Sequence, residues 1–114
     1  MKFKFEKLII WQKAMELGED IFNMSENYLK SEIFNLTSQS RRAADSIALN
    51  NAEGSIYQSN LEQKKYMGYS IRSLAEVVTC LHKAKRRKYI DDTQFNKLYE
   101  DSYNLMISFK ENIK

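Results

Sequence analysis

The sequence has no proline, and only three of its 114 residues are glycine. A β-rich fold of this length needs many tight turns, and tight turns recruit glycine and proline. A four-helix bundle needs only a few short connections, so it tolerates a chain that is poor in both residues. The scarcity of turn formers therefore predicts an all-α protein with long helices.

Cysteine and histidine are equally scarce, with one residue of each. A lone Cys80 cannot form an internal disulfide, which suits a reducing compartment. Cys80 and His82 are two positions apart, so on a helix they point to different sides and cannot form a nucleophile–base pair. A di-iron centre of the bundle type needs Glu-x-x-His motifs on two helices, but Thr79 stands where the glutamate would lie. With no glycine-rich phosphate loop and no zinc-ligand spacing, we expect neither an enzyme nor a bound metal or cofactor.

Long apolar runs are missing as well. No stretch approaches the roughly 20 apolar residues of a membrane-spanning helix. The apolar run at residues 8–11 is too short for the core of a signal peptide. We therefore expect a cytoplasmic protein with no membrane partner. The net charge of +3 is a mild basic bias that leaves anionic partners open.

Apolar residues recur at steps of three and four along four segments, which is the period of a helix with one buried face. The segments span about residues 8–29, 36–57, 59–87 and 91–113. Ser59 and Asp91 each precede a Glu or Gln by three positions, the capping-box pattern that begins a helix. Because short connections force antiparallel neighbours, residues 1–114 are predicted to form one up-down-up-down four-helix bundle. Its predicted core includes Trp11, Met15, Ile47, Leu74, Val78, Leu98 and Phe109.

A basic cluster closes the third predicted helix: Lys83, Lys85, Arg86, Arg87 and Lys88. Such a cluster is a candidate contact surface for the phosphates of RNA or DNA. The alternative is that these cations compensate the negative end of the helix dipole, where each contributes about 0.3–1 kcal/mol. Two or three cations satisfy that role, and Asp91 and Asp92, which follow at once, can neutralise part of the cluster.

A polar stripe lies on one face of the second predicted helix: Gln39, Arg42, Ser46, Asn50 and Glu53. Serine and asparagine are poor helix formers, so this face favours a hydrogen-bonded network or a subunit interface over a plain solvated surface. We expect Arg42 to pair with a carboxylate. Glu53 lies roughly 16 Å further along the same helix, so the pair either crosses to another subunit or uses Glu76 on the third helix.

The seven tyrosines, six phenylalanines and one tryptophan lie mostly on the predicted core stripes. Tyrosines outside the core are common at protein interfaces. Stacking on nucleic-acid bases is the less favoured alternative. The candidates are Tyr57, Tyr66, Tyr69 and Tyr89.

Three segments resemble a known family. Residues 5–14 (FEKLIIWQKA) are similar to its opening, residues 32–47 (EIFNLTSQSRRAADSI) to its central motif, and residues 50–54 (NNAEG) to the end of that motif. Ser73 and Glu76 match a weaker signal on the third helix, and we add both to the polar stripe. The family is called the four-helix-bundle proteins, or the proteins of the 23S ribosomal RNA intervening sequence. Asn51 departs from its pattern, because the family usually has an apolar residue there.

The resemblance implies an up-down-up-down bundle that assembles as a ring-shaped homopentamer. One branch of the family is the accessory protein of diversity-generating retroelements, which resembles a basic ring that binds a reverse transcriptase and its RNA. The implied partners are further copies of the chain, RNA or DNA, and a polymerase-type protein.

Two functions therefore compete. The first is an RNA-binding or nucleoprotein-assembly module, which predicts a basic surface and strongly salt-dependent binding. The second is a protein-interaction scaffold without a nucleic-acid role, which predicts an exposed apolar or aromatic patch and little response to salt.

Overall fold

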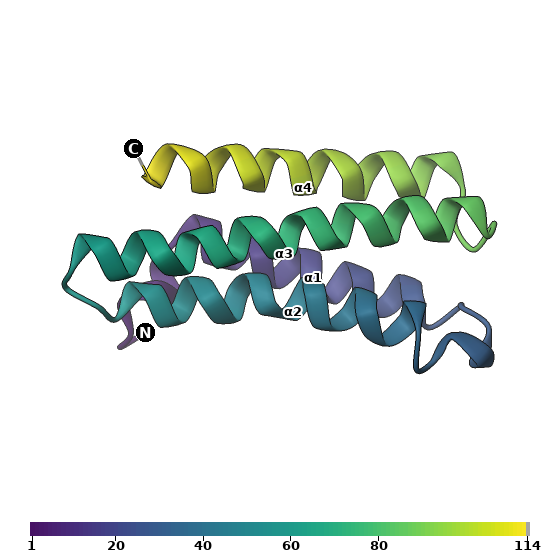
Figure 1. Cartoon of the computed structure of the whole chain (residues 1–114), viewed down its shortest axis with the longest axis horizontal. Coiled ribbons are helices and arrows are strands. Elements are labelled where there is room, and N and C mark those ends of the chain that lie inside the picture. Colours follow the sequence, from purple (N-terminus) through teal and green to yellow (C-terminus); the bar gives the residue numbers. More distant parts are fainter. Residues whose placement is uncertain (114) are drawn as a thin grey trace.

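The computed structural model describes residues 1–113 and shows an antiparallel four-helix bundle (Figure 1). The described residues form no strand, and the helices run alternately up and down along a body of 44 × 23 × 22 Å. Two short 3₁₀ helices, η1 (Lys4–Lys7) and η2 (Lys30–Glu32), precede the first and second long helices. The long helices are α1 (Ile9–Ser25), α2 (Leu36–Ser55), α3 (Asn60–Arg86) and α4 (Asp92–Ile113). The predicted all-α, up-down-up-down fold is confirmed.

The capping boxes expected at Ser59 and Asp91 have different outcomes. At Asp91 both bonds form: the Gln94 backbone N–H donates to the Asp91 carboxylate at 2.8 Å, and the Asp91 N–H donates to the Gln94 side chain at 3.1 Å. Ser59 stands at the N-cap of α3, but its side chain makes no capping bond to any described residue, so that prediction is wrong. The Gln63 amide instead donates to the Tyr57 carbonyl at 2.6 Å and ties the turn to the helix.

Helix α1 ends earlier than the sequence pattern predicts, at Ser25 rather than near residue 29. Beyond it the backbone turns, with the Tyr28 N–H donating to the Ser25 carbonyl at 3.1 Å. This turn buries Tyr28, whose ring stacks on Tyr89 at 4.9 Å between centroids. An aromatic contact between distant segments therefore overrides the helical pattern of residues 26–29.

The end of α3 has the two hydrogen bonds of a Schellman motif. The Tyr89 N–H donates to the Ala84 carbonyl at 2.9 Å, and the Lys88 N–H donates to the Lys85 carbonyl at 3.0 Å. Lys88 occupies the left-handed position that such a motif requires, with φ 62°. Glycine is the usual residue there, because a side chain is strained in this conformation.

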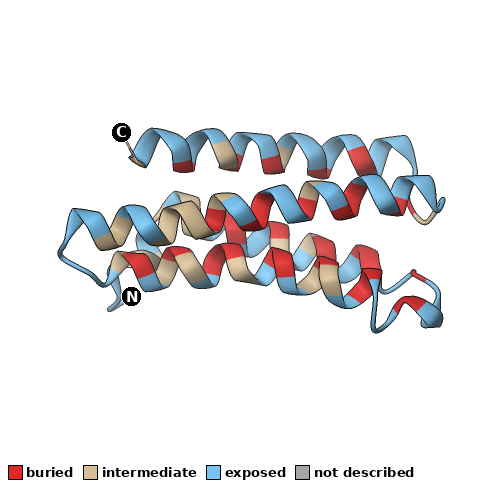
Figure 2. Cartoon of the chain, in the orientation of Figure 1, coloured by how far each residue is buried: buried red, intermediate tan, exposed pale blue. Residues whose placement is uncertain are grey.

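The core lies on the inward faces of all four helices (Figure 2). Four of the predicted core residues are buried: Ile47, Leu74, Leu98 and Phe109. The other three are not: Met15 is 44% exposed, and Trp11 and Val78 are only half-buried. On α1 the inward positions are Ala14, Leu17 and Ile21, and on α3 Val77 replaces Val78. On α1 the buried face is thus displaced by one residue from the predicted one, about 100° around the axis, whereas on α3 Leu74 is buried as predicted.

Helices α2 and α3 form the most extensive helix pair of the bundle, whereas α1 and α4 touch least among the neighbouring helices. The small residues of α2 make the close approach of α3 possible. A Cβ atom built on Gly54 would lie only 2.7 Å from the Cβ of Tyr66. The Ser70 hydroxyl also donates directly to the Ile47 carbonyl of α2, at 2.9 Å. The described helices include none that is long and apolar enough to span a membrane.

Candidate nucleic-acid interface at the basic end of the bundle

All five residues of the basic cluster are exposed in the structure, where α3 ends and the chain turns into α4. This end of the bundle, which we call the basic end, also carries the connection between α1 and α2 (Figure 1). The five cations nevertheless have different surroundings. Two of them are engaged by other parts of the chain.

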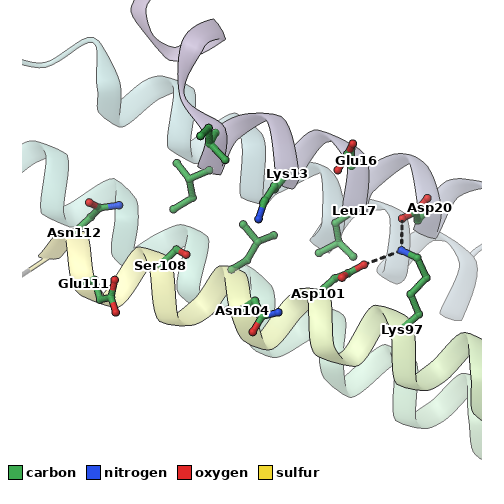
Figure 3. A pocket seen from close by; sticks show the side chains of 13 residues that line it. Lys13, Glu16, Leu17, Asp20, Lys97, Asp101, Asn104, Ser108, Glu111 and Asn112 are labelled. Carbon is green, nitrogen blue, oxygen red and sulfur yellow. Dashed lines mark hydrogen bonds and ion pairs between the residues drawn. The ribbon is translucent and has the colours of Figure 1, made fainter.

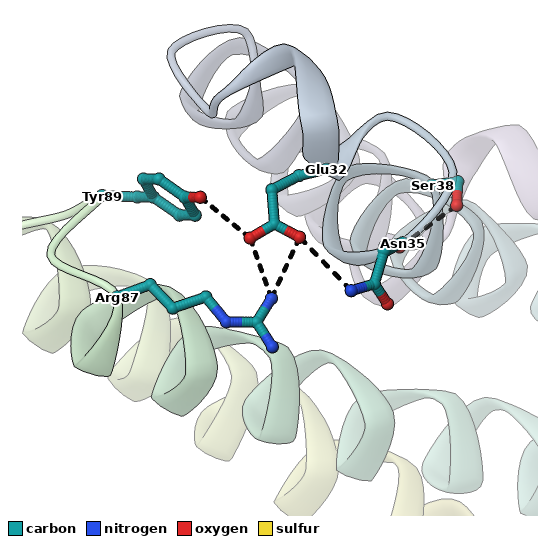
Figure 4. A network of polar contacts seen from close by, with 5 residues as sticks. All are labelled: Glu32, Asn35, Ser38, Arg87 and Tyr89. Carbon is teal, nitrogen blue, oxygen red and sulfur yellow. Dashed lines mark hydrogen bonds and ion pairs between the residues drawn. The ribbon is translucent and has the colours of Figure 1, made fainter.

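Arg87 is bound to Glu32 (Figure 4). Its Nη1 donates to both carboxylate oxygens, at 3.0 and 2.9 Å, and the Tyr89 hydroxyl donates to the same carboxylate at 2.8 Å. The Asn35 amide adds a fourth bond, at 3.3 Å. Only 10% of the Glu32 side chain is exposed, against 39% for Arg87. This network joins the α1–α2 connection to the end of α3.

The network shifts the acid–base behaviour of its members. The hydrogen bond from Tyr89 and the positive charge of Arg87 lower the pKa of Glu32. Burial and the same hydrogen bond to Glu32 raise the pKa of Tyr89. Arg87 thus stabilises an anion of its own chain, and its role in the structure is to hold Glu32. The sequence pattern marked Arg87 as a ligand contact and missed Glu32 altogether.

Lys85 is the second engaged cation. Its Nζ lies 3.2 Å from the Asp92 carboxylate and 4.6 Å from the centre of the Phe95 ring. Of the basic cluster, Asp92 therefore neutralises Lys85 alone. The cations of the cluster that form no ion pair within residues 1–113 are Lys83, Arg86 and Lys88, which we call the free basic triad.

The polar stripe divides into a paired and an unpaired part. The Ser46 hydroxyl donates to Ser73 at 2.6 Å across the α2–α3 interface, and the Asn50 amide donates to the Ser46 carbonyl at 2.8 Å. A hydrogen-bonded network at this interface is thus present, with Ser73 buried and Ser46 half-buried. It binds two helices of one chain together.

The expected ion pair of Arg42 does not form within residues 1–113. The Ser46–Ser73 contact places Arg42 and Glu76 at the same height on adjacent antiparallel helices, one turn away. Both side chains are exposed, as is Glu53, and the described part of the chain gives Arg42 no ion-pair partner. Gln39 is half-buried.

A groove of about 470 Å³ lies between α1 and α4, where these helices touch least (Figure 3). Its floor is apolar and includes Leu17 and Leu105. Lys97 closes one side by contacting Asp101 at 2.8 Å and Asp20 at 3.4 Å. The hydrogen bond to Asp101 is the main cause of the raised pKa of Lys97. Because four carboxylates line this groove against two lysines, it is a weaker candidate for an anion site than the basic end.

Cys80 and His82 lie apart, as their spacing predicts. Cys80 is buried in the core, whereas His82 is exposed and packs edge-on against Phe95, with 4.9 Å between ring centroids. No nucleophile–base pair is formed by these two residues. His82 thus belongs to an aromatic cluster with Phe95 and Tyr99, beside Lys85.

The fold and the basic end together define a small, all-helical bundle, and one end of it carries three cations that form no ion pair with the described residues. A family model described as 23S rRNA-intervening sequence protein matches residues 6–108. The chain therefore belongs to the 23S rRNA-intervening sequence protein family.

A crystal structure from Bacteroides thetaiotaomicron, described as a protein of unknown function from the S23 ribosomal protein family, has the same fold. The two superpose with a TM-score of 0.86 at 21% sequence identity, over 93% of this chain and 99% of that one. No curated protein matches the sequence. The family model thus establishes the family, and the crystal structure independently supports the fold.

Proposed function

We propose that this chain is a non-enzymatic RNA-binding module that contacts phosphates with the free basic triad. The observation that carries the proposal is that Lys83, Arg86 and Lys88 form no ion pair within the described part of the chain, whereas Arg87 and Lys85 are engaged by Glu32 and Asp92. Cations that a fold does not use are available to release counterions from a polyanion. The description of the family, which refers to 23S rRNA, supports RNA over DNA.

We also propose that the module works as a closed homo-oligomer, for which the family resemblance suggests a pentamer. Three free cations in one chain give weak binding, but copies joined in a ring act together on one strand. An apolar groove of about 470 Å³ between α1 and α2 supports self-association, because Met15 and Leu49 expose 44% and 64% of their surface there. Contacts between unlike surfaces that close on themselves produce a ring.

RNA binding is tested by replacing the free basic triad with glutamine (Lys83→Gln, Arg86→Gln, Lys88→Gln). A matched control removes the same amount of charge from three exposed lysines near the N-terminus (Lys2→Gln, Lys4→Gln, Lys7→Gln). Arg87 is left in place, so that the Glu32 network is intact. We expect the triad variant, but not the control, to lose affinity for a labelled RNA duplex. Its slope of log affinity against log salt concentration should be smaller by about 0.9 for each phosphate contact that is lost. Equal affinity of both variants would refute the role of the basic end.

Assembly is tested by light scattering on Leu49→Glu, with Ile107→Glu on α4 as the control. One chain has a mass of 13.5 kDa. We expect the wild-type chain and the control to show a multiple of this mass and Leu49→Glu to approach the single-chain value, because a buried unpaired charge disrupts an apolar contact. A wild-type protein that is a monomer at micromolar concentration would end the proposal of a ring.

A second candidate function is a protein-interaction scaffold, with a polymerase-type protein as one partner. It is supported by three apolar side chains on the α1–α2 connection: Leu29, Ile33 and Phe34 are 63%, 54% and 95% exposed. Exposed apolar groups that lie together are typical of protein contacts. RNA affinity that is unchanged in the triad variant, with the oligomer intact, would favour this function.

A further inference from the structure

Three tyrosines form a continuous aromatic cluster at the end of the bundle opposite the basic end, where α2 leads into α3. The rings of Tyr57 and Tyr66 are stacked, with 5.5 Å between centroids and 13° between planes. Tyr69 meets Tyr66 edge to face, also at 5.5 Å. We call these residues the tyrosine cluster. Tyr57 is 39% exposed and the other two are half-buried, so the cluster presents an aromatic surface to solvent.

The cluster is held in place by the backbone of both helices. The absence of a side chain at Gly54 lets the Cβ of Tyr66 come close to α2. Tyr57 is fixed from the other side, because the Gln63 amide donates to its carbonyl at 2.6 Å. An aromatic surface that is already ordered loses little entropy when a ligand binds.

Cations flank the tyrosine cluster. The Lys65 ammonium lies 5.8 Å from the centre of the Tyr66 ring, and the Arg72 guanidinium lies 5.5 Å from that of Tyr69. Lys64 is exposed on the same turn of α3. The carboxylates that face the cluster are Glu53 and Glu62, and Glu62 contacts Lys65 at 4.0 Å. The surroundings are therefore only mildly positive, in contrast to the basic end.

We propose that the tyrosine cluster is a stacking platform for the bases of single-stranded RNA. Every base has an aromatic face, so stacking on tyrosine is tolerant of sequence, and flanking Lys and Arg side chains can follow the strand's phosphates. The base stacks on the outer face of Tyr57, because Tyr57 and Tyr66 are already in contact and leave no room for a base between them. A duplex keeps its bases inside and cannot use such a platform.

This inference deepens the proposed function and rests on it. The basic end contacts phosphates of either a duplex or a single strand, whereas the tyrosine cluster distinguishes between the two. The two sites lie at opposite ends of the bundle, so they can be removed separately.

The test measures fluorescence anisotropy of a labelled oligouridine of about 12 nucleotides, within the usual site size, and of an RNA duplex. The test variant is Tyr57→Ala, and the matched control is Tyr103→Ala, which removes a tyrosine that is 54% exposed on α4. We expect Tyr57→Ala to bind the single strand at least about fivefold more weakly, with duplex affinity unchanged. Tyr103→Ala should match the wild-type protein, and Tyr57→Phe should retain most of the affinity because its ring still stacks.

The possible outcomes separate the two proposals. Equal single-strand affinity of Tyr57→Ala and Tyr103→Ala overturns the stacking platform, as does a wild-type protein that binds the duplex but no single strand. A change of oligomer mass in Tyr57→Ala, seen by light scattering, assigns the tyrosine to a contact between copies and also overturns it. If the wild-type protein binds neither RNA, the proposed function fails together with this inference. Thermal melts followed by circular dichroism check that each variant is folded.

Discussion

Replacing Gly54 with alanine tests whether close contact between α2 and α3 holds the bundle together. The added Cβ would lie 2.7 Å from the Cβ of Tyr66, whereas carbon atoms in good contact are about 3.5–4.0 Å apart. The Tyr66 Cβ is fixed to the α3 backbone and cannot move by a rotamer change. The two helices must therefore separate locally by about 1 Å, which strains the 2.6 Å bond between Ser46 and Ser73.

The size of the effect follows from two opposing contributions. Inserting a methyl group into a packed interface typically costs about 1–3 kcal/mol, and the fixed position of the Tyr66 Cβ puts this site at about 2–3 kcal/mol. Alanine regains about 1 kcal/mol over glycine through its helix propensity. We therefore expect Gly54→Ala to lower the free energy of unfolding by about 1–2 kcal/mol.

Gly68→Ala is the matched control. Gly68 also lies inside a helix, but a Cβ built there meets no atom of the described chain within 4 Å. This variant gains the propensity without the clash, so we expect it to be more stable than the wild-type protein by about 0.5–1 kcal/mol. Urea unfolding followed by far-UV circular dichroism, at one protein concentration, measures both. If Gly54→Ala were as stable as Gly68→Ala, the argument from close helix packing would be refuted.

Three further predictions concern single residues. Asn51 is 4% exposed and its Oδ1 has no hydrogen-bond partner among residues 1–113, so Asn51→Leu should raise the free energy of unfolding by about 1–3 kcal/mol. Asn50→Leu loses a hydrogen bond and should not be more stable than the wild-type protein. Urea unfolding compares the two variants. Lys88→Gly should relieve the backbone strain at φ 62° and stabilise the protein by about 1 kcal/mol. A melting temperature of Lys88→Gly that is no higher than that of Lys88→Ala would contradict this prediction. Because the pKa of Glu32 is lowered in the folded protein, the unfolded chain binds a proton at this carboxylate first as the pH falls below 4.5. The free energy of unfolding should therefore decrease below this pH in the wild-type protein, and decrease less in Glu32→Gln. Melting temperatures that fall in parallel for both proteins from pH 7 to pH 3 would argue against this role of Glu32.

The amino-acid sequence by itself determined the helical fold and its topology. Helical periodicity and capping are local properties, so the four long helices and the Asp91 cap could be found from residues a few positions apart. The connections are too short to allow anything but antiparallel neighbours. The pattern predicted the rotation of α1 less accurately, since Met15 is exposed and Leu17 is buried. An apolar stripe that is wider than the buried face of a helix fits more than one orientation of that helix.

The tertiary structure alone decided which polar groups are free. Arg87 looks like its neighbours in the basic cluster, but it is bound to Glu32, which is 55 residues away in the chain. The tyrosine cluster likewise depends on how closely α3 approaches Gly54, a distance that no local pattern contains. Pairing across the bundle depends on helix rotation and register, and both are set by packing of the whole core. The sequence therefore showed where charges and rings occur, while the packed helices decided which of them remain available to a partner.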